Sequence, residues 1–128
     1  MRRAYFDTSA ITKLSHVEAC SLALLGYLDD AEIEVSTSVV AEVEVARALR
    51  RVKVDPTDAV KGFYLLALDE DVRREAARIG AATLRALDAI HLATAVSIGD
   101  RSLEFVTYDD RQAAAAREAG LTVVQPGR

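Results

Sequence analysis

The chain has 128 residues, 51% of them hydrophobic, and its formal net charge at pH 7 is −4. This length and apolar content predict a single domain over residues 1–128 with a core of its own. The negative charge disfavours a protein that coats nucleic acid with a broad basic surface. One cysteine, Cys20, excludes an internal disulfide and any zinc site built from several cysteines.

The first residues, Met1-Arg2-Arg3, lead directly into a short apolar segment rather than into a long one. No apolar run in the sequence is long enough to span a membrane. We therefore expect a cytoplasmic protein without a signal peptide or a membrane contact.

Hydrophobic periodicity predicts strands and helices in alternation. In residues 17–29 apolar side chains recur at helical spacing, and Cys20 is expected on the buried side of that helix. The run 63–68 is apolar throughout, which is typical of a strand buried on both faces. Strands are expected at 3–7, 33–36, 63–68, 103–107 and 122–124, and helices at 9–15, 17–29, 38–52, 57–62, 70–81, 84–98 and 109–119.

Strands separated by helices require crossover connections, which favour parallel pairing with helices on both faces of the sheet. The predicted fold class is therefore α/β, with three α/β/α layers around a central, mainly parallel sheet of four to five strands.

Two acids fall where predicted strands end, which is the edge at which open α/β sheets form their sites. Asp7 ends the first strand, and Asp109 or Asp110 follows the strand at 103–107. Each also has a simpler interpretation, because an aspartate at a helix start accepts hydrogen bonds from free backbone N–H groups.

Asp88 lies in a helical segment that is apolar on nearly every side, so the segment is expected to be buried. A buried unpaired charge is costly. Either Arg85 or His91 is close enough in sequence to pair with it, and His91 is expected to be a hydrogen-bonded helix residue rather than a metal ligand.

The helix after Ser38 carries Glu42 and Glu44, which point about 200° apart around the helix axis. Only one of the two can face a given pocket. Because this helix is apolar on most sides, the helical wheel does not choose between them.

These segments together resemble the PIN domain family of nucleases. Tyr5-Phe6-Asp7-Thr8-Ser9-Ala10 is similar to the family's opening motif, and the helix from Ser38 to Leu49 to its second, acidic motif. The segment 84–95 is similar to the third motif, and Phe105-Val106-Thr107-Tyr108-Asp109 to the fourth. The length and motif style resemble VapC toxins, and the resemblance selects Glu44 and Asp109 over Glu42 and Asp110.

The resemblance implies that Asp7, Glu44, Asp88 and Asp109 are catalytic and bind Mg²⁺ or Mn²⁺, and carboxylates alone do suit such hard cations. Thr8 and Thr107 are expected to orient those carboxylates. It further implies an endoribonuclease toxin that cleaves structured RNA (tRNA or rRNA), forms a homodimer and is covered by a VapB-type antitoxin. The alternative is a non-catalytic PIN-like module that binds RNA or protein.

Overall fold

The computed structural model describes residues 1–30 and 32–128. Its centre is a five-stranded sheet with the strand order β3-β2-β1-β4-β5, and each neighbouring pair of strands is parallel. The strands are β1 (Arg2–Phe6), β2 (Ile33–Ser38), β3 (Tyr64–Leu66), β4 (Glu104–Val106) and β5 (Thr122–Val124).

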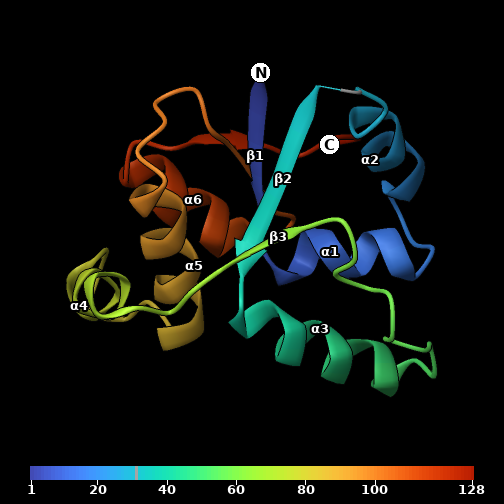
Figure 1. Ribbon diagram of the computed structural model, residues 1–128, viewed down its shortest axis with the longest axis horizontal. Helices are drawn as coiled ribbons and strands as arrows, with labels where there is room; N and C mark the ends of the chain where they lie inside the picture. Colours follow the sequence, from blue (N-terminus) through green and yellow to red (C-terminus); the bar gives the residue numbers. More distant parts are fainter. Residues whose placement is uncertain (31) are drawn as a thin grey trace.

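Helices cover both faces of this sheet (Figure 1), which confirms the predicted three-layer α/β/α class. One layer holds α1 (Thr8–Ser15), α2 (Ser21–Tyr27) and α3 (Val40–Arg51). The other holds α4 (Glu70–Arg78), α5 (Ala86–Ser97) and α6 (Asp110–Glu118). None of the helices in the described residues is long and apolar enough to cross a membrane.

The central strand β1 divides the core into two clusters because successive side chains of a strand point to opposite faces. Phe6 packs with Ile11 and Val45 on the side of α1 and α3. Tyr5 packs with Leu92 and Phe105 on the side of α5 and α6. Burying a side chain of this size contributes about 1.5–3 kcal/mol, so β1 anchors both layers and fixes the position of the residue that follows it.

The segment before β3 differs from the prediction. Residues 57–62 form successive turns instead of a helix, and β3 is shorter than the expected 63–68. Tyr64 is 62% exposed, so the prediction of a strand buried on both faces is wrong. The reason is its place in the sheet: β3 is the outermost strand and pairs with β2 alone.

The predicted helix over 17–29 begins only at Ser21. The Ser21 hydroxyl donates to the Lys13 carbonyl and accepts from the Glu18 N–H, which fixes the helix start there. Cys20 precedes the helix in a left-handed conformation with a φ of 73° and is only partly buried, so its predicted place inside a helix is wrong. Within this helix Leu22 is 85% exposed.

Candidate active site

Asp7 follows β1 directly, and its backbone is still extended while its side chain caps α1. The carboxylate accepts from the Ser9 hydroxyl at 2.6 Å and from the Ala10 N–H at 3.1 Å. Its second oxygen accepts from the Thr107 hydroxyl, so the residue after β4 also holds it. The side chain is therefore fixed from two strand ends at once.

The Asp7 side chain is almost entirely buried, with 5% exposure, and forms no salt bridge with the described residues. Burial raises the pKa of the Asp7 carboxyl, and the hydrogen bonds from Ser9 and Thr107 offset this rise only in part. A buried carboxylate that has donors but no counter-charge is a group that a cation would stabilise.

Glu44 extends from α3 toward α1 and α5. Its Oε1 accepts from the Thr8 hydroxyl at 2.8 Å and contacts Nε2 of His91 at 2.8 Å. Partial burial alone would raise the pKa of Glu44, but the hydrogen bonds from His91 and Thr8 outweigh this effect, so the pKa is lowered. Glu42 is exposed, so Glu44 is the acid that faces this edge of the sheet.

His91 is buried and links Glu44 to β1. Its Nδ1 lies 2.6 Å from the Tyr5 hydroxyl, while its Nε2 faces the Glu44 carboxylate. An ionised carboxylate only accepts, so Nε2 carries the proton and Nδ1 accepts from Tyr5 in the neutral ring. The expectation that His91 is a hydrogen-bonded helix residue is confirmed by these contacts.

Asp88 and Asp109 are joined by one basic side chain. Arg85 Nε donates to Asp88 Oδ2 at 3.1 Å, and Arg85 Nη2 donates to Asp109 Oδ2 at 3.5 Å. Asp88 lies in the first turn of α5, where Leu87 is 45% exposed, so the prediction of a helix buried on every side is wrong at this end. The buried part of α5 begins at Ala89 and continues through the middle of the helix.

Asp109 caps α6, as its simpler interpretation predicts. Its Oδ1 accepts from the backbone N–H groups of Arg111 and Gln112 at 2.9 and 3.2 Å, which leaves Oδ2 to point away from the helix. Asp110, whose side chain is 78% exposed, pairs with Arg128 instead. Asp109 is therefore the acid that faces Arg85 and the edge of the sheet.

Hydrogen bonds link three of the four acids, which are Asp7, Asp88 and Asp109, while Glu44 bonds to Thr8 and His91 instead. Thr107 bonds both the Asp7 carboxylate and the Asp109 N–H, so it ties the first acid to the last. Among the described residues, however, no three acids, histidines or cysteines lie close enough together to hold one metal ion between them. The acids are gathered at one edge without forming a closed cage.

This donor set still fits Mg²⁺, and Mn²⁺ by the same chemistry. Mg²⁺ in proteins keeps several waters and is bound through one or two carboxylates rather than by a dedicated all-protein cage. Four oxygen donors that are spread around an edge, one of them buried without a counter-charge, match that requirement.

Two residues at this edge were not predicted as part of it. Ser9 bonds Asp7 and also accepts from the Tyr108 N–H, and its place two residues after Asp7 was the available signal. Gln112 is fully buried and donates to the Asp88 carbonyl at 3.1 Å, which fixes α6 against α5. A glutamine among the polar residues of α6 gives no such indication in the sequence.

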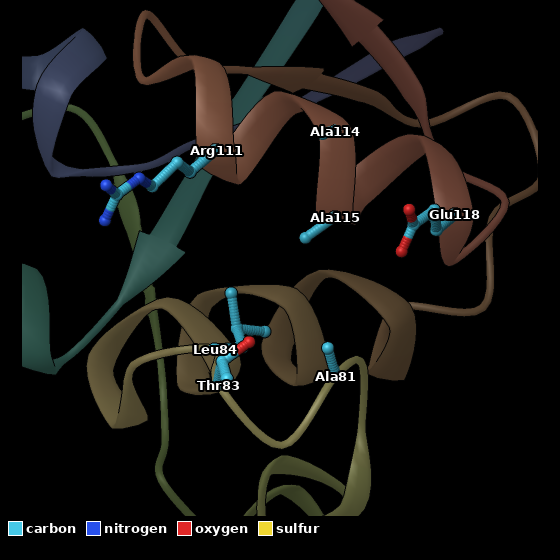
Figure 2. A pocket seen from close by; sticks show the side chains of 7 residues that line it. All are labelled: Ala81, Thr83, Leu84, Arg111, Ala114, Ala115 and Glu118. Atoms are coloured by element: carbon cyan, nitrogen blue, oxygen red, sulfur yellow. The ribbon is translucent and has the colours of Figure 1, made fainter.

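One hollow in the described surface lies away from the acids. It has a volume of about 440 Å³ and lies between α6 and the loop that precedes α5. Figure 2 shows Leu84 and Ala115 pointing into it, with Arg111 and Glu118 at its two ends. Its mostly small and apolar lining offers no chemistry for a reaction, so the acid edge is the candidate active site.

Comparisons with known proteins identify the family of the chain. The sequence profile of the PIN domain matches residues 4–118. Ribonuclease VapC35 of Mycobacterium tuberculosis is 40% identical over 131 residues, which cover 97% of each chain.

Solved structures share the fold. The crystal structure of M. tuberculosis VapC20, described as a sarcin-ricin loop cleaving toxin, has a TM-score of 0.76 at 18% identity and covers 96% of this chain and 99% of its own. A toxin–antitoxin complex from Klebsiella pneumoniae has a TM-score of 0.71 at 22% identity, covering 96% and 97%. The chain described here therefore belongs to the PIN domain family.

Proposed function

We propose that this protein is a divalent-metal-dependent endoribonuclease that acts as the toxin of a type II toxin–antitoxin pair. The observation that carries the proposal is the edge of four acids that includes the carboxylate of Asp7, which is buried and forms no salt bridge in the described residues. The 40% identity to a ribonuclease VapC over nearly the whole chain supports the same activity.

Asp7, Glu44, Asp88 and Asp109 are the residues we assign to Mg²⁺ or Mn²⁺, directly or through water. When bound, such an ion supplies an activated water and neutralises charge on the scissile phosphate. The remaining work belongs to the protein's own side chains, which must hold the acids in place before substrate arrives.

Hydroxyl groups and His91 do this positioning. Ser9 in α1 and Thr107 after β4 donate to different oxygens of Asp7, so the carboxylate is held at both oxygens. Thr8 and His91 both hold Oε1 of Glu44, which leaves Oε2 directed away from them. Partners of this kind orient metal ligands, and losing one commonly costs about 10- to 100-fold in affinity or activity.

A basic surface suited to the RNA backbone lies on the same helix as Glu44. Arg47, Arg50 and Arg51 are exposed and line a hollow of about 290 Å³ on α3. With a rise of 1.5 Å per residue, Arg47 lies about 4.5 Å and Arg51 about 10.5 Å along the helix from Glu44. A strand that enters the acid edge would therefore follow these arginines, which neutralise its phosphates.

The relatives suggest the partners and the setting. The K. pneumoniae structure is a toxin–antitoxin complex, and we assign a VapB-type antitoxin and a homodimer to this chain as well. A basic side chain of the antitoxin that enters the four acids would be a charge-assisted contact. VapC20 is described as cleaving the sarcin-ricin loop, which favours structured RNA such as tRNA or rRNA as the substrate class. We assign the protein to the cytoplasm and treat it as a single-domain enzyme.

The test is RNA cleavage by the purified protein without antitoxin. With Mn²⁺ or Mg²⁺ the wild type should cut total RNA of its host, and EDTA should stop the reaction. Asp7→Asn and Asp88→Asn should each lower the rate by about 100-fold or more, because a ligand matters at least as much as its partners. Glu42→Gln is the matched control, since Glu42 is exposed on the same helix as Glu44.

Cleavage by Asp7→Asn at the rate of Glu42→Gln would contradict the assignment of the site. Binding of RNA without cleavage by the wild type would instead favour a non-catalytic PIN-like module. The observation that favours this second candidate is that no three acids in the described residues lie close enough together to hold one metal ion.

A further inference from the structure

Arg85 holds an unusual position for a basic residue. It is the N-cap of α5 and its side chain makes no capping bond there. Short polar side chains are preferred at this position, and a positive charge is disfavoured beside the positive end of the helix dipole. The helix therefore gives no reason for an arginine here, whereas the acids beside it do.

The guanidinium forms ion pairs with two of the four acids. Within residues 1–30 and 32–128, no other arginine or lysine forms an ion pair with any of them. The pKa of Arg85 is raised chiefly by the hydrogen bond and charge of Asp88, with further contributions from Asp109 and Glu44. Arg85 thus experiences the charge of three of the four acids.

The atoms that Arg85 contacts are the ones a metal ion needs. Asp109 Oδ1 is already committed to two backbone N–H groups of α6, so Oδ2 is the oxygen available to a ligand. Arg85 Nη2 donates to that same Oδ2. An ion bound by Asp109 and the arginine therefore compete for one atom, and both also draw on Asp88.

We propose that Arg85 is an internal counter-ion of the acid site, which neutralises Asp88 and Asp109 in the metal-free protein and must withdraw when a divalent cation binds. The inference rests on the proposed function, because it takes these acids as the metal ligands. It adds a residue that sets metal affinity and stabilises the empty site.

Withdrawal of Arg85 is sterically simple. Its side chain is 66% exposed, so the guanidinium can move into water without repacking a core residue. The loop before it also borders the hollow shown in Figure 2, into which Leu84 points. Once released beside the acids, a planar guanidinium is suited to a phosphate of the substrate.

With competition of this kind, the apparent affinity for the metal equals the intrinsic affinity multiplied by the fraction of molecules in which Arg85 is withdrawn. Arg85→Met removes the competitor and keeps most of the side-chain volume. We expect it to bind Mn²⁺ about three- to tenfold more tightly than the wild type, the range that corresponds to one or two exposed ion pairs.

The first measurement is a calorimetric titration of the full, EDTA-stripped chain with MnCl₂ alone. Arg111→Met is the matched control, because Arg111 carries the same charge two residues after Asp109 and forms no ion pair with the four acids in the described residues. Arg85→Lys should have an intermediate Mn²⁺ affinity, since lysine keeps the positive charge but lacks the planar guanidinium that bonds both carboxylates. Equal affinity of Arg85→Met and Arg111→Met would overturn the inference, because the effect would then be general electrostatics.

The second measurement observes the exchange directly. In ¹H–¹⁵N spectra the Arg85 Nε–H signal, assigned by its loss in Arg85→Lys, should move on addition of Mg²⁺ to the position of a water-exposed arginine. A signal that does not move while Mg²⁺ binds would overturn the proposal.

The two proposals fail in different ways. If the wild type binds no divalent ion, both are wrong. If binding is present and lost in Asp88→Asn, but Arg85→Met has the affinity of the control, the metal site stands and the role of Arg85 falls.

Discussion

Replacing Tyr5 by phenylalanine tests whether the buried chain from β1 through His91 holds Glu44 in place. The Tyr5 hydroxyl is the partner of His91 Nδ1 at 2.6 Å, and the two side chains are 0% and 2% exposed. The phenyl ring would keep its stacking on Phe105, where the centroids are 5.4 Å apart, so the apolar contribution is unchanged. Only the hydrogen bond is lost.

The expected cost follows from what remains behind. A buried acceptor left without a donor costs about 1–3 kcal/mol, so Tyr5→Phe should lower the free energy of unfolding by that amount. Urea unfolding of the metal-free protein in EDTA measures it. Tyr64→Phe is the control, because Tyr64 is 62% exposed on the edge strand and its change should stay within about 0.5 kcal/mol.

A double-mutant cycle tests whether His91 couples Tyr5 to Glu44. Tyr5 and Glu44 contact opposite nitrogens of the His91 ring, so Tyr5→Phe and Glu44→Gln should be coupled by about 0.5–3 kcal/mol. If the two changes add to within about 0.3–0.5 kcal/mol, His91 does not transmit the effect and the reasoning is refuted. Equal stabilities of Tyr5→Phe and Tyr64→Phe would refute it as well.

Two further predictions concern the charges of the site. Burial raises the pKa of Asp7, so between its ordinary value of 3.8 and that raised value the folded state binds more protons than the unfolded state, and its stability falls as the pH rises. In EDTA, Asp7→Asn should therefore have a larger free energy of unfolding than the wild type at pH 7, and the difference should shrink as the pH is lowered toward 4. Urea unfolding at each pH measures this difference, and a difference that grows toward pH 4 would contradict the prediction. On α3, Arg47→Glu with Arg51→Glu should weaken RNA binding by an Asp88→Asn background protein and reduce the slope of log affinity against log salt by about 2. Arg74→Glu with Arg78→Glu on α4 is the matched control, and an equal loss of affinity in that pair would show that net charge alone is responsible.

Much of the fold follows from local patterns, because a strand that ends in an acid and a helix that ends at glycine leave clear signals. β1, β5 and the helices around Leu92 and Ala113 lie where periodicity predicts them. The apolar run at 63–68 does hold a strand, β3, but its predicted burial on both faces is wrong, because an apolar run reads the same whether the strand is central or outermost. Whether a strand is central or outermost depends on which other strands of the chain pair with it.

The candidate site shows the same division between local and distant information. Asp7 and Asp109 are strand-end residues, so their shared edge is a consequence of parallel topology. The orientation of Glu44 depends on His91, which is 47 residues away in sequence, and no wheel drawn for α3 contains that contact. The Arg85 bridge likewise joins Asp88, three residues away, to Asp109, 24 residues away.

The strand order also bears on how the protein is made. β1 is synthesised first, yet its neighbours are β2 and β4, so the middle of the sheet stays incomplete until residue 106 has left the ribosome. Thr107 and Asp109, which complete the surroundings of Asp7, emerge only after that. For the nuclease proposed above, this order of synthesis means that a nascent or prematurely terminated chain has no assembled acid edge.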